Sequence, residues 1–221
     1  MMAIQVDQPE PRCLPVIVLA DTSGSMSVDG KIEVLNDAIR RMIDAFAKLD
    51  LPECEVNLAL IAFGGEEARF HVPLTAVSEL AWKPLDAAGR TPMGHAFGLV
   101  RRLLDDREVI PPRSYRPHLV LVSDGIPTDE WRKPLADLDA AEQAGRALRF
   151  AVGIGADATG EVLRTFAGEQ GEVVPVEQVE VLTEFFRFIT YTVATSVHRP
   201  IASQADVLTF DEYPANDVPE F

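Results

Sequence analysis

Three short polar runs contain the residues whose types and spacing could bind a metal ion. In the run from Asp21 to Ser25, three oxygen-bearing residues stand at alternate positions, so Asp21, Ser23 and Ser25 can converge on one side of a tight loop. Thr91 adds a hydroxyl at a helix start, and Asp124 adds a second carboxylate. Two carboxylates and three hydroxyls are hard oxygen ligands, which suit Mg²⁺, with Mn²⁺ or Ca²⁺ as alternatives, and do not suit zinc or copper.

These five side chains are too few to complete the coordination shell of such an ion. Mg²⁺ prefers six oxygens at about 2.1 Å and retains water where the protein supplies too few. An incompletely ligated divalent ion is a docking point for an incoming carboxylate. The sequence therefore predicts an open metal site that binds an acidic residue of a partner protein and does not catalyse a reaction.

Alternating apolar runs and amphipathic stretches predict an α/β fold around these residues. Residues 14–20 and 118–123 are apolar runs typical of strands buried on both faces, and they end directly before Asp21 and Asp124. Since the carboxyl ends of parallel strands share one edge, where ligands bind, the two carboxylates should lie close together. Further strands are predicted over residues 56–63, 68–74, 148–154 and 172–176, and helices over residues 31–49, 91–104, 134–147, 159–167 and 179–197.

Two of these elements carry further predictions. His71 and Pro73 indicate that residues 68–74 form an edge strand, because proline cannot donate to a central ladder. In the last helix, three phenylalanines follow one another so closely that they cannot all face one core, so one is expected to pack elsewhere. They are Phe185, Phe186 and Phe188.

The polar runs resemble those of one known family. An Asp-x-Ser-Gly-Ser run after a buried first strand, a Thr before a major helix and an Asp after the fourth strand resemble the von Willebrand factor A (vWA) domain and its metal-ion-dependent adhesion site. The resemblance covers residues 13–197, and all five site positions match in order. The runs Asp21-Thr-Ser-Gly-Ser-Met, Gly89-Arg-Thr-Pro-Met-Gly and Ser123-Asp-Gly-Ile-Pro-Thr-Asp most resemble the bacterial tellurium-resistance TerY-type branch.

The resemblance implies a fold, a ligand set and a biological context. The fold would be a doubly wound, mostly parallel six-stranded sheet with one antiparallel edge strand and helices on both faces, and residues 1–12 and 198–221 would lie outside this domain. Ser23, Ser25 and Thr91 would bind the metal directly, whereas the two aspartates would act mainly through water and hydrogen bonds. The context would be bacterial stress, with a kinase, a phosphatase or another Ter protein as partner.

Four more residues near these runs are candidates for contacting a partner: Arg90, His95, Asp129 and Trp131. Arg90 stands where the TerY-type branch often has a second glycine, and it would either steer an acidic ligand or point into solvent. His95 follows Thr91 by one helical turn and would either border the site or pack against its neighbours. Asp129 is suited to capping a helix, and an exposed Trp131 would be a partner anchor.

Bulk properties narrow the choice of partners and location. The net charge of −15 argues against nucleic acids and anionic membranes, because both are negatively charged. No apolar run approaches about 18 residues and no signal-peptide pattern begins the chain, so we expect a cytoplasmic protein. Cys13 and Cys54 are expected to be free, half-buried thiols.

The C-terminal residues 200–221 contain acidic residues and no Lys or Arg. This composition predicts a tail that is either disordered or docked on another surface. An acidic tail residue such as Asp211 or Glu212 could occupy the metal site of its own or a neighbouring molecule, because an extended tail of this length reaches about 70 Å.

The alternative function is a Mg²⁺-dependent phosphohydrolase that uses the same crevice with Asp21 as its nucleophile. Such enzymes usually place a second carboxylate two residues after the nucleophile, where this chain has Ser23. No helpful lysine is expected nearby either. We therefore favour binding over catalysis.

Overall fold

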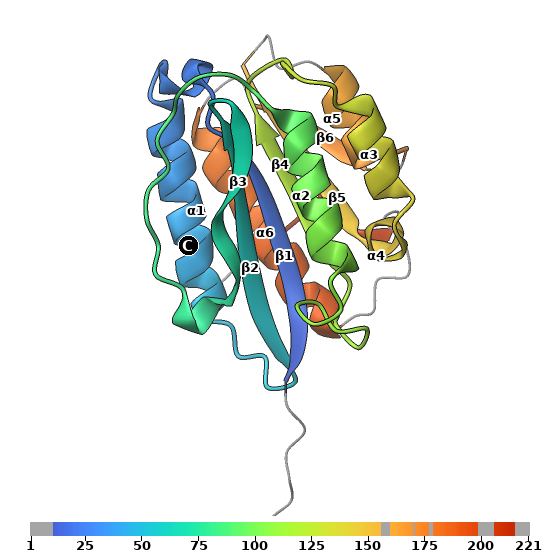
Figure 1. Ribbon diagram of the computed structural model, residues 1–221. Coiled ribbons are helices and arrows are strands. Elements are labelled where there is room, and N and C mark those ends of the chain that lie inside the picture. The colour runs from blue at the N-terminus through green and yellow to red at the C-terminus, as the bar shows by residue number, and fades with distance from the viewer. Residues whose placement is uncertain (1–10, 156–159, 170, 177–178, 199–205, 215–221) are drawn as a thin grey trace, which may run out of the picture.

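The computed structural model describes residues 11–155, 160–169, 171–176, 179–198 and 206–214, which surround one six-stranded sheet (Figure 1). The strands are β1 (Arg12–Asp21), β2 (Cys54–Gly64), β3 (Glu67–Ala76), β4 (His118–Ser123), β5 (Leu148–Ile154) and β6 (Glu172–Val176). Their spatial order is β3-β2-β1-β4-β5-β6, and only β3, at one edge, is antiparallel to its neighbour. The predicted mostly parallel sheet with one antiparallel edge strand is confirmed.

Helices cover both faces of this sheet (Figure 1). One face is covered by α1 (Lys31–Ala47) and α6 (Val179–His198), and the other by α2 (Met93–Asp105), α3 (Arg132–Asp139), α4 (Glu142–Arg146) and α5 (Gly160–Ala167). Two 3-10 turns, η1 (Gly24–Ser27) and η2 (Val77–Glu79), complete the described elements. In β1, Val16 and Val18 face α1 and α6, whereas Ile17 and Leu19 face α2, so the strand is apolar throughout.

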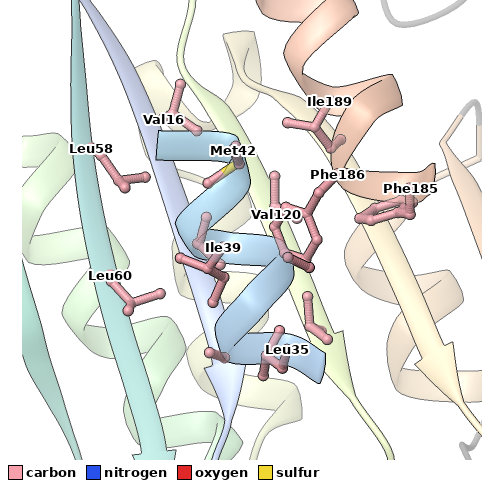
Figure 2. Close-up of a cluster of buried hydrophobic side chains, with 14 of the residues drawn as sticks. Val16, Leu35, Ile39, Met42, Leu58, Leu60, Val120, Phe185, Phe186 and Ile189 are labelled. Atoms are coloured by element: carbon pink, nitrogen blue, oxygen red, sulfur yellow. The ribbon is translucent and has the colours of Figure 1, made fainter. Parts of the chain in front are cut away.

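The packing of α1 against the sheet fixes where the first polar loop lies. Leu35, Ile39 and Met42 recur at steps of four and three, form one stripe and are fully buried against β1 and β2 (Figure 2). Phe186 and Ile189 of α6 fill the space beside them, and the two helices contact each other (Figure 2). The N-terminal end of α1 is thereby held at the carboxyl edge of β1.

No helix among the described residues is long and apolar enough to span a membrane.

The last helix corrects one prediction, because all three of its clustered phenylalanines are buried: Phe185, Phe186 and Phe188. Residues 206–214 of the C-terminal segment pack along α6 and provide a second wall. The ring centroids of Phe210 and Tyr213 lie 5.9 Å and 5.5 Å from that of Phe188. This part of the tail is therefore docked on its own domain, and the rest of residues 200–221 lies outside the described residues.

The predicted helix over residues 134–147 is wrong in one respect, because two short helices replace it. Between α3 and α4, Ala141 is extended, with φ −77° and ψ 135°. Buried residues still recur every three positions through the break, which explains the prediction of one helix: Leu135, Leu138, Ala141, Ala144 and Ala147. The guanidinium of Arg149 on β5 donates to Asp139 Oδ1 at 2.5 Å and to the Ala144 carbonyl oxygen at 3.3 Å, so it binds both helices.

Replacing Arg149 by methionine should lower the free energy of unfolding by roughly 2–4 kcal/mol, because buried carbonyl oxygens and a carboxylate lose their donor. Urea unfolding of wild type and variant measures the loss. Arg101→Met is the matched control, since its ion pair with Asp105 is exposed on both sides and should contribute less than about 1 kcal/mol. Equal losses in the two variants would contradict the role given to Arg149.

His118, at the start of β4, makes the stability of the fold depend on pH. It is fully buried and stacks on Phe150, and burial lowers the pKa of its imidazole from 6.5 to about 4. In the unfolded chain this imidazole binds a proton near pH 6.5, whereas in the folded chain it does so only near pH 4. Protonation therefore favours the unfolded chain, and this group destabilises the fold as the pH falls between these two values.

Replacing His118 by phenylalanine should remove this loss of stability. Relative to wild type, the free energy of unfolding of the variant should rise by about 1.4 kcal/mol for each unit of pH decrease across that interval. Urea unfolding at several pH values measures the difference. Parallel pH profiles of the two proteins would mean that His118 takes up its proton equally in both states.

Candidate functional site

Two neighbouring strands, β1 and β4, end beside each other, and the predicted metal-binding carboxylates stand at these ends. Asp21 is the last residue of β1 and Asp124 directly follows β4, while Ala20 pairs with Val122 just before them. Both aspartates are buried, with 0% and 5% of their surface exposed. The edge of the sheet therefore brings together two acidic groups that are 103 positions apart in the chain.

Hydrogen bonds hold these carboxylates against serine side chains. Ser25 Oγ donates to Asp124 Oδ1 at 2.7 Å and lies 3.0 Å from Ser23 Oγ. Ser123 Oγ donates to Asp21 Oδ2 at 2.5 Å, and the backbone N–H of Ser23 donates to Asp21 Oδ1 at 2.8 Å. The two loops are thus joined by the groups that the sequence singled out.

Gly125 marks the point at which the oxygens converge. A Cβ atom at Gly125 would lie 3.8 Å from Ser25 Oγ, 3.8 Å from Thr91 Oγ1 and 3.9 Å from Asp21 Oδ2. Oxygens from the 21–25 loop and from Thr91 therefore surround one small space beside Gly125, and the hydrogen bond from Ser25 Oγ joins the carboxylate of Asp124, from a third segment, to them. Among the described residues no three His, Cys, Asp or Glu side chains cluster as metal ligands, so a metal ion here would depend on the hydroxyl groups.

Thr91 is brought to this space by a backbone crossing at Gly89. The N–H of Gly24 donates to the carbonyl oxygen of Gly89 at 3.0 Å, and the N–H of Ala88 donates to that of Thr22 at 2.8 Å. Gly89 has φ +73°, and a Cβ atom there would lie only 2.5 Å from the Cα of Gly65. The crossing therefore requires glycine, and it sets the position of the threonine two residues later.

Lys31, the first residue of α1, is a site residue that the sequence reasoning missed. Its Nζ lies 2.6 Å from Asp124 Oδ2, and only 1% of the Asp124 side chain is exposed. The expectation that no lysine lies nearby is wrong, because α1 begins at the sheet edge where β4 ends. The sequence did contain one sign of this contact, because Lys31 is the first residue of the helix that follows the loop of residues 21–25. Its ammonium group takes the place beside Asp124 that a metal ion could take, which indicates that this site attracts positive charge.

The charge balance of the site also favours a cation. Burial is the main reason why the pKa of the Asp21 carboxyl is raised from 3.8 to about 6; hydrogen bonds from Ser123 and Ser23 act in the opposite direction, and the nearby Asp124 adds a smaller increase.

 Asp124 has the Lys31 ammonium as a partner, whereas the partners of Asp21 are neutral groups. The two carboxylates thus carry one more negative charge than the single ammonium balances, and the hard oxygen donors around them fit a divalent ion.

The structure gives the other predicted residues mixed positions. Asp129 caps α2, since its carboxylate accepts hydrogen bonds from the N–H groups of Gly94 and His95 at 3.0 Å and 2.9 Å. His95 Nδ1 accepts a hydrogen bond from the N–H of Ala68, so its side chain ties α2 to β3. Arg90 is exposed at the sheet edge, where it remains a candidate for meeting a partner.

Trp131 is buried, with 9% of its surface exposed, and packs under α2 and α3. The exposed anchor that the sequence allowed at this position is therefore wrong. The exposed hydrophobic residue of the same loop is Ile126, which sequence reasoning missed and which is 63% exposed two residues after Asp124.

Cys13 and Cys54 are free, as expected. Cys13 is half-buried as predicted, whereas Cys54 is buried. Burial raises the pKa of the two thiols to about 11 and about 12.

Comparison with known proteins decides the family. The sequence profile of the von Willebrand factor type A domain (VWA) matches residues 16–188. The chain belongs to the von Willebrand factor type A domain family. Domains of this family are generally metal-dependent protein-interaction modules. No curated protein sequence matches this vWA domain significantly.

Solved structures share the fold of this vWA domain. The von Willebrand factor type A protein from Catenulispora acidiphila is 26% identical, with a TM-score of 0.62 over 83% of this chain and 43% of that one. Proximal thread matrix protein 1 from the mussel byssus, with a zinc-occupied MIDAS motif, is 16% identical, with a TM-score of 0.61 over 85% and 46%. The pilus adhesin SpaC from Lactobacillus rhamnosus GG is 12% identical, with a TM-score of 0.64 over 86% and 31%. This vWA domain spans less than half the length of each.

Proposed function

We propose that this vWA domain holds one divalent metal ion and uses it to capture a carboxylate of a partner protein. The convergence of hydroxyl and carboxylate oxygens from three segments carries this proposal. Three residues would bind the ion directly and two would act mainly through water and hydrogen bonds: Ser23, Ser25 and Thr91, and Asp21 and Asp124, respectively. Mg²⁺ suits this donor set, and Mn²⁺ or Ca²⁺ would also fit it. When bound, the ion supplies a positive charge with open coordination positions.

The surroundings of Asp21 support binding over catalysis. Its side chain is fully buried, and both of its oxygens accept hydrogen bonds, so a substrate could reach either oxygen only if the surrounding groups moved. Lys31 lies near, but Ser23 stands where a phosphohydrolase usually has its second carboxylate. Turnover of a generic phosphate ester by the wild-type protein, abolished in Asp21→Asn, would overturn this choice.

The setting in which the domain acts is a further part of the proposal. The residues of the three polar runs favour a bacterial stress or tellurium-resistance context in the cytoplasm, with a kinase, a phosphatase or another Ter protein as partner.

The C-terminal tail of this vWA domain offers a carboxylate that could compete with that of a partner protein. Glu212 accepts hydrogen bonds from the N–H and hydroxyl of Thr209 at 3.2 Å and 2.9 Å, whereas Asp211 is exposed. Asp211 is therefore the better candidate for occupying the metal site of a neighbouring molecule.

A pull-down from native cell extract tests the proposed function. Wild type and Asp21→Ala are each used as bait in Mg²⁺ and in EDTA, with Asp44→Ala as the matched control because Asp44 is an exposed acidic residue on α1. A partner held by wild type and Asp44→Ala in Mg²⁺, and lost in EDTA and in Asp21→Ala, would support the proposal. Partners that are indifferent to metal and to Asp21 would overturn it.

A further inference from the structure

Lys31 places a positive charge inside the candidate metal site before any metal ion binds. Its Nζ lies 2.6 Å from Asp124 Oδ2, and its side chain is 20% exposed. The other oxygen of this carboxylate, Oδ1, accepts the hydrogen bond from Ser25 Oγ at 2.7 Å. Both oxygens of Asp124 are thus occupied by groups of the chain itself, one of them by a full positive charge.

A divalent ion in the same site would share Asp124 with this ammonium group. The ion would sit among the oxygens that surround Gly125, which include Ser25 Oγ, the hydroxyl that is hydrogen-bonded to Asp124. Two positive charges beside one carboxylate repel each other, and water screens this repulsion poorly where the carboxylate is buried. The ammonium therefore offsets part of the attraction that the carboxylates exert on the ion.

The same ammonium group stabilises the site when the metal is absent. Asp124 is almost completely buried, and a buried carboxylate without a counter-ion is costly. The bond from Lys31 joins the start of α1 to the loop after β4, which are 93 residues apart in the chain. Without it, the two segments that carry the metal-binding residues would lose their ionic connection.

We propose that Lys31 is a built-in counter-ion of Asp124 that lowers the affinity of the site for a divalent metal ion and holds its loops together without one. This inference rests on the proposed metal binding. The metal site of this vWA domain would then fill only at a higher concentration of the ion, because a metal-free state with balanced charge at Asp124 competes with the metal-bound state.

Replacement of Lys31 by methionine tests both halves of the inference. Methionine removes the charge and keeps a long side chain with high helix propensity. In a Mn²⁺ titration followed by electron paramagnetic resonance, the dissociation constant should fall by about tenfold or more. In EDTA, the melting temperature of the same variant should fall below that of wild type, because Asp124 is left without its counter-ion.

Two controls separate the local charge from other effects. Lys31→Arg keeps the positive charge and should bind Mn²⁺ much as wild type does. Lys48→Met makes the same change of net charge just beyond the other end of α1, about 25 Å away at 1.5 Å per residue, and should leave the Mn²⁺ dissociation constant unchanged. Lys31→Gln repeats the test if the methionine variant does not fold.

The outcomes distinguish this inference from the proposed function. If wild type binds Mn²⁺ and Lys31→Met binds it equally or more weakly, the inference is overturned and the metal site stands. An unchanged melting temperature in EDTA would overturn the stabilising half. If neither wild type nor Lys31→Met binds Mn²⁺, both the metal site and the inference fail.

Discussion

Replacement of Asp21 by alanine is expected to weaken Mn²⁺ binding by about 100-fold and to abolish metal-dependent capture of a partner. The carboxylate contributes negative charge next to the converging hydroxyls, and it also holds the backbone of Ser23 and the side chain of Ser123. Both the attraction for the ion and the shape of the loop are lost together. A Mn²⁺ titration of the purified protein measures the first effect without any knowledge of the partner.

Asp21→Asn separates the charge from the geometry. An asparagine has the same shape, its oxygen can still accept the N–H of Ser23, and Ser123 can accept from its amide while donating to the carbonyl oxygen of Gly125. We expect this variant to lose most of its Mn²⁺ affinity while its melting temperature in EDTA does not fall, because burial disfavours the charged form of Asp21. Wild-type affinity in both variants would exclude Asp21 from the metal site.

Replacing Gly89 by alanine should both destabilise the fold and weaken metal binding. A Cβ atom there would lie 2.5 Å from the Cα of Gly65, and φ is +73°, a conformation that strains every residue with a side chain. Overlap and strain together should lower the free energy of unfolding by roughly 2–4 kcal/mol. The shift of the crossing also moves Thr91, so the Mn²⁺ dissociation constant should rise. Urea unfolding and a metal titration measure the two effects.

Two other glycines serve as controls for this variant. Gly65→Ala has a strained φ of +78° but meets no atom within 4 Å, so it should cost about 1 kcal/mol. Gly145→Ala, inside α4, has neither strain nor overlap and should be neutral or stabilise by up to about 1 kcal/mol. A loss at Gly89 no larger than that at Gly65 would mean that the backbone crossing yields easily and does not position Thr91.

Much of the fold could be predicted because buried parallel strands have an unmistakable pattern. The apolar runs predicted both ends of β4, β5 and β6, and the proline at residue 73 predicted the edge position of β3. Patterns that depend only on local periodicity failed where another segment intervened. The step of three between buried residues continues through the break at Ala141, and Phe188 is buried because a distant tail packs on it.

The candidate site could be predicted in its composition but not in its charge balance. Oxygen-bearing residues at strand ends are visible in the sequence, since the edge of a parallel sheet gathers such ends without further information. The contact between Lys31 and Asp124 depends on where α1 begins relative to β4 and on the reach of one flexible side chain. Likewise, the sequence does not show that Trp131 is buried and Ile126 exposed, because this depends on how the loop that contains them folds over α2.

The most direct test of the account is to locate the metal ion in a crystal grown with Mn²⁺, using anomalous scattering. We predict one strong anomalous peak at the carboxyl edge of β1 and β4, bonded directly to the side-chain oxygens of Ser23, Ser25 and Thr91, with water or a carboxylate from another molecule completing its shell. A peak at a different place, or no peak at a Mn²⁺ concentration that saturates binding in solution, would contradict the central claim that these hydroxyls hold the ion.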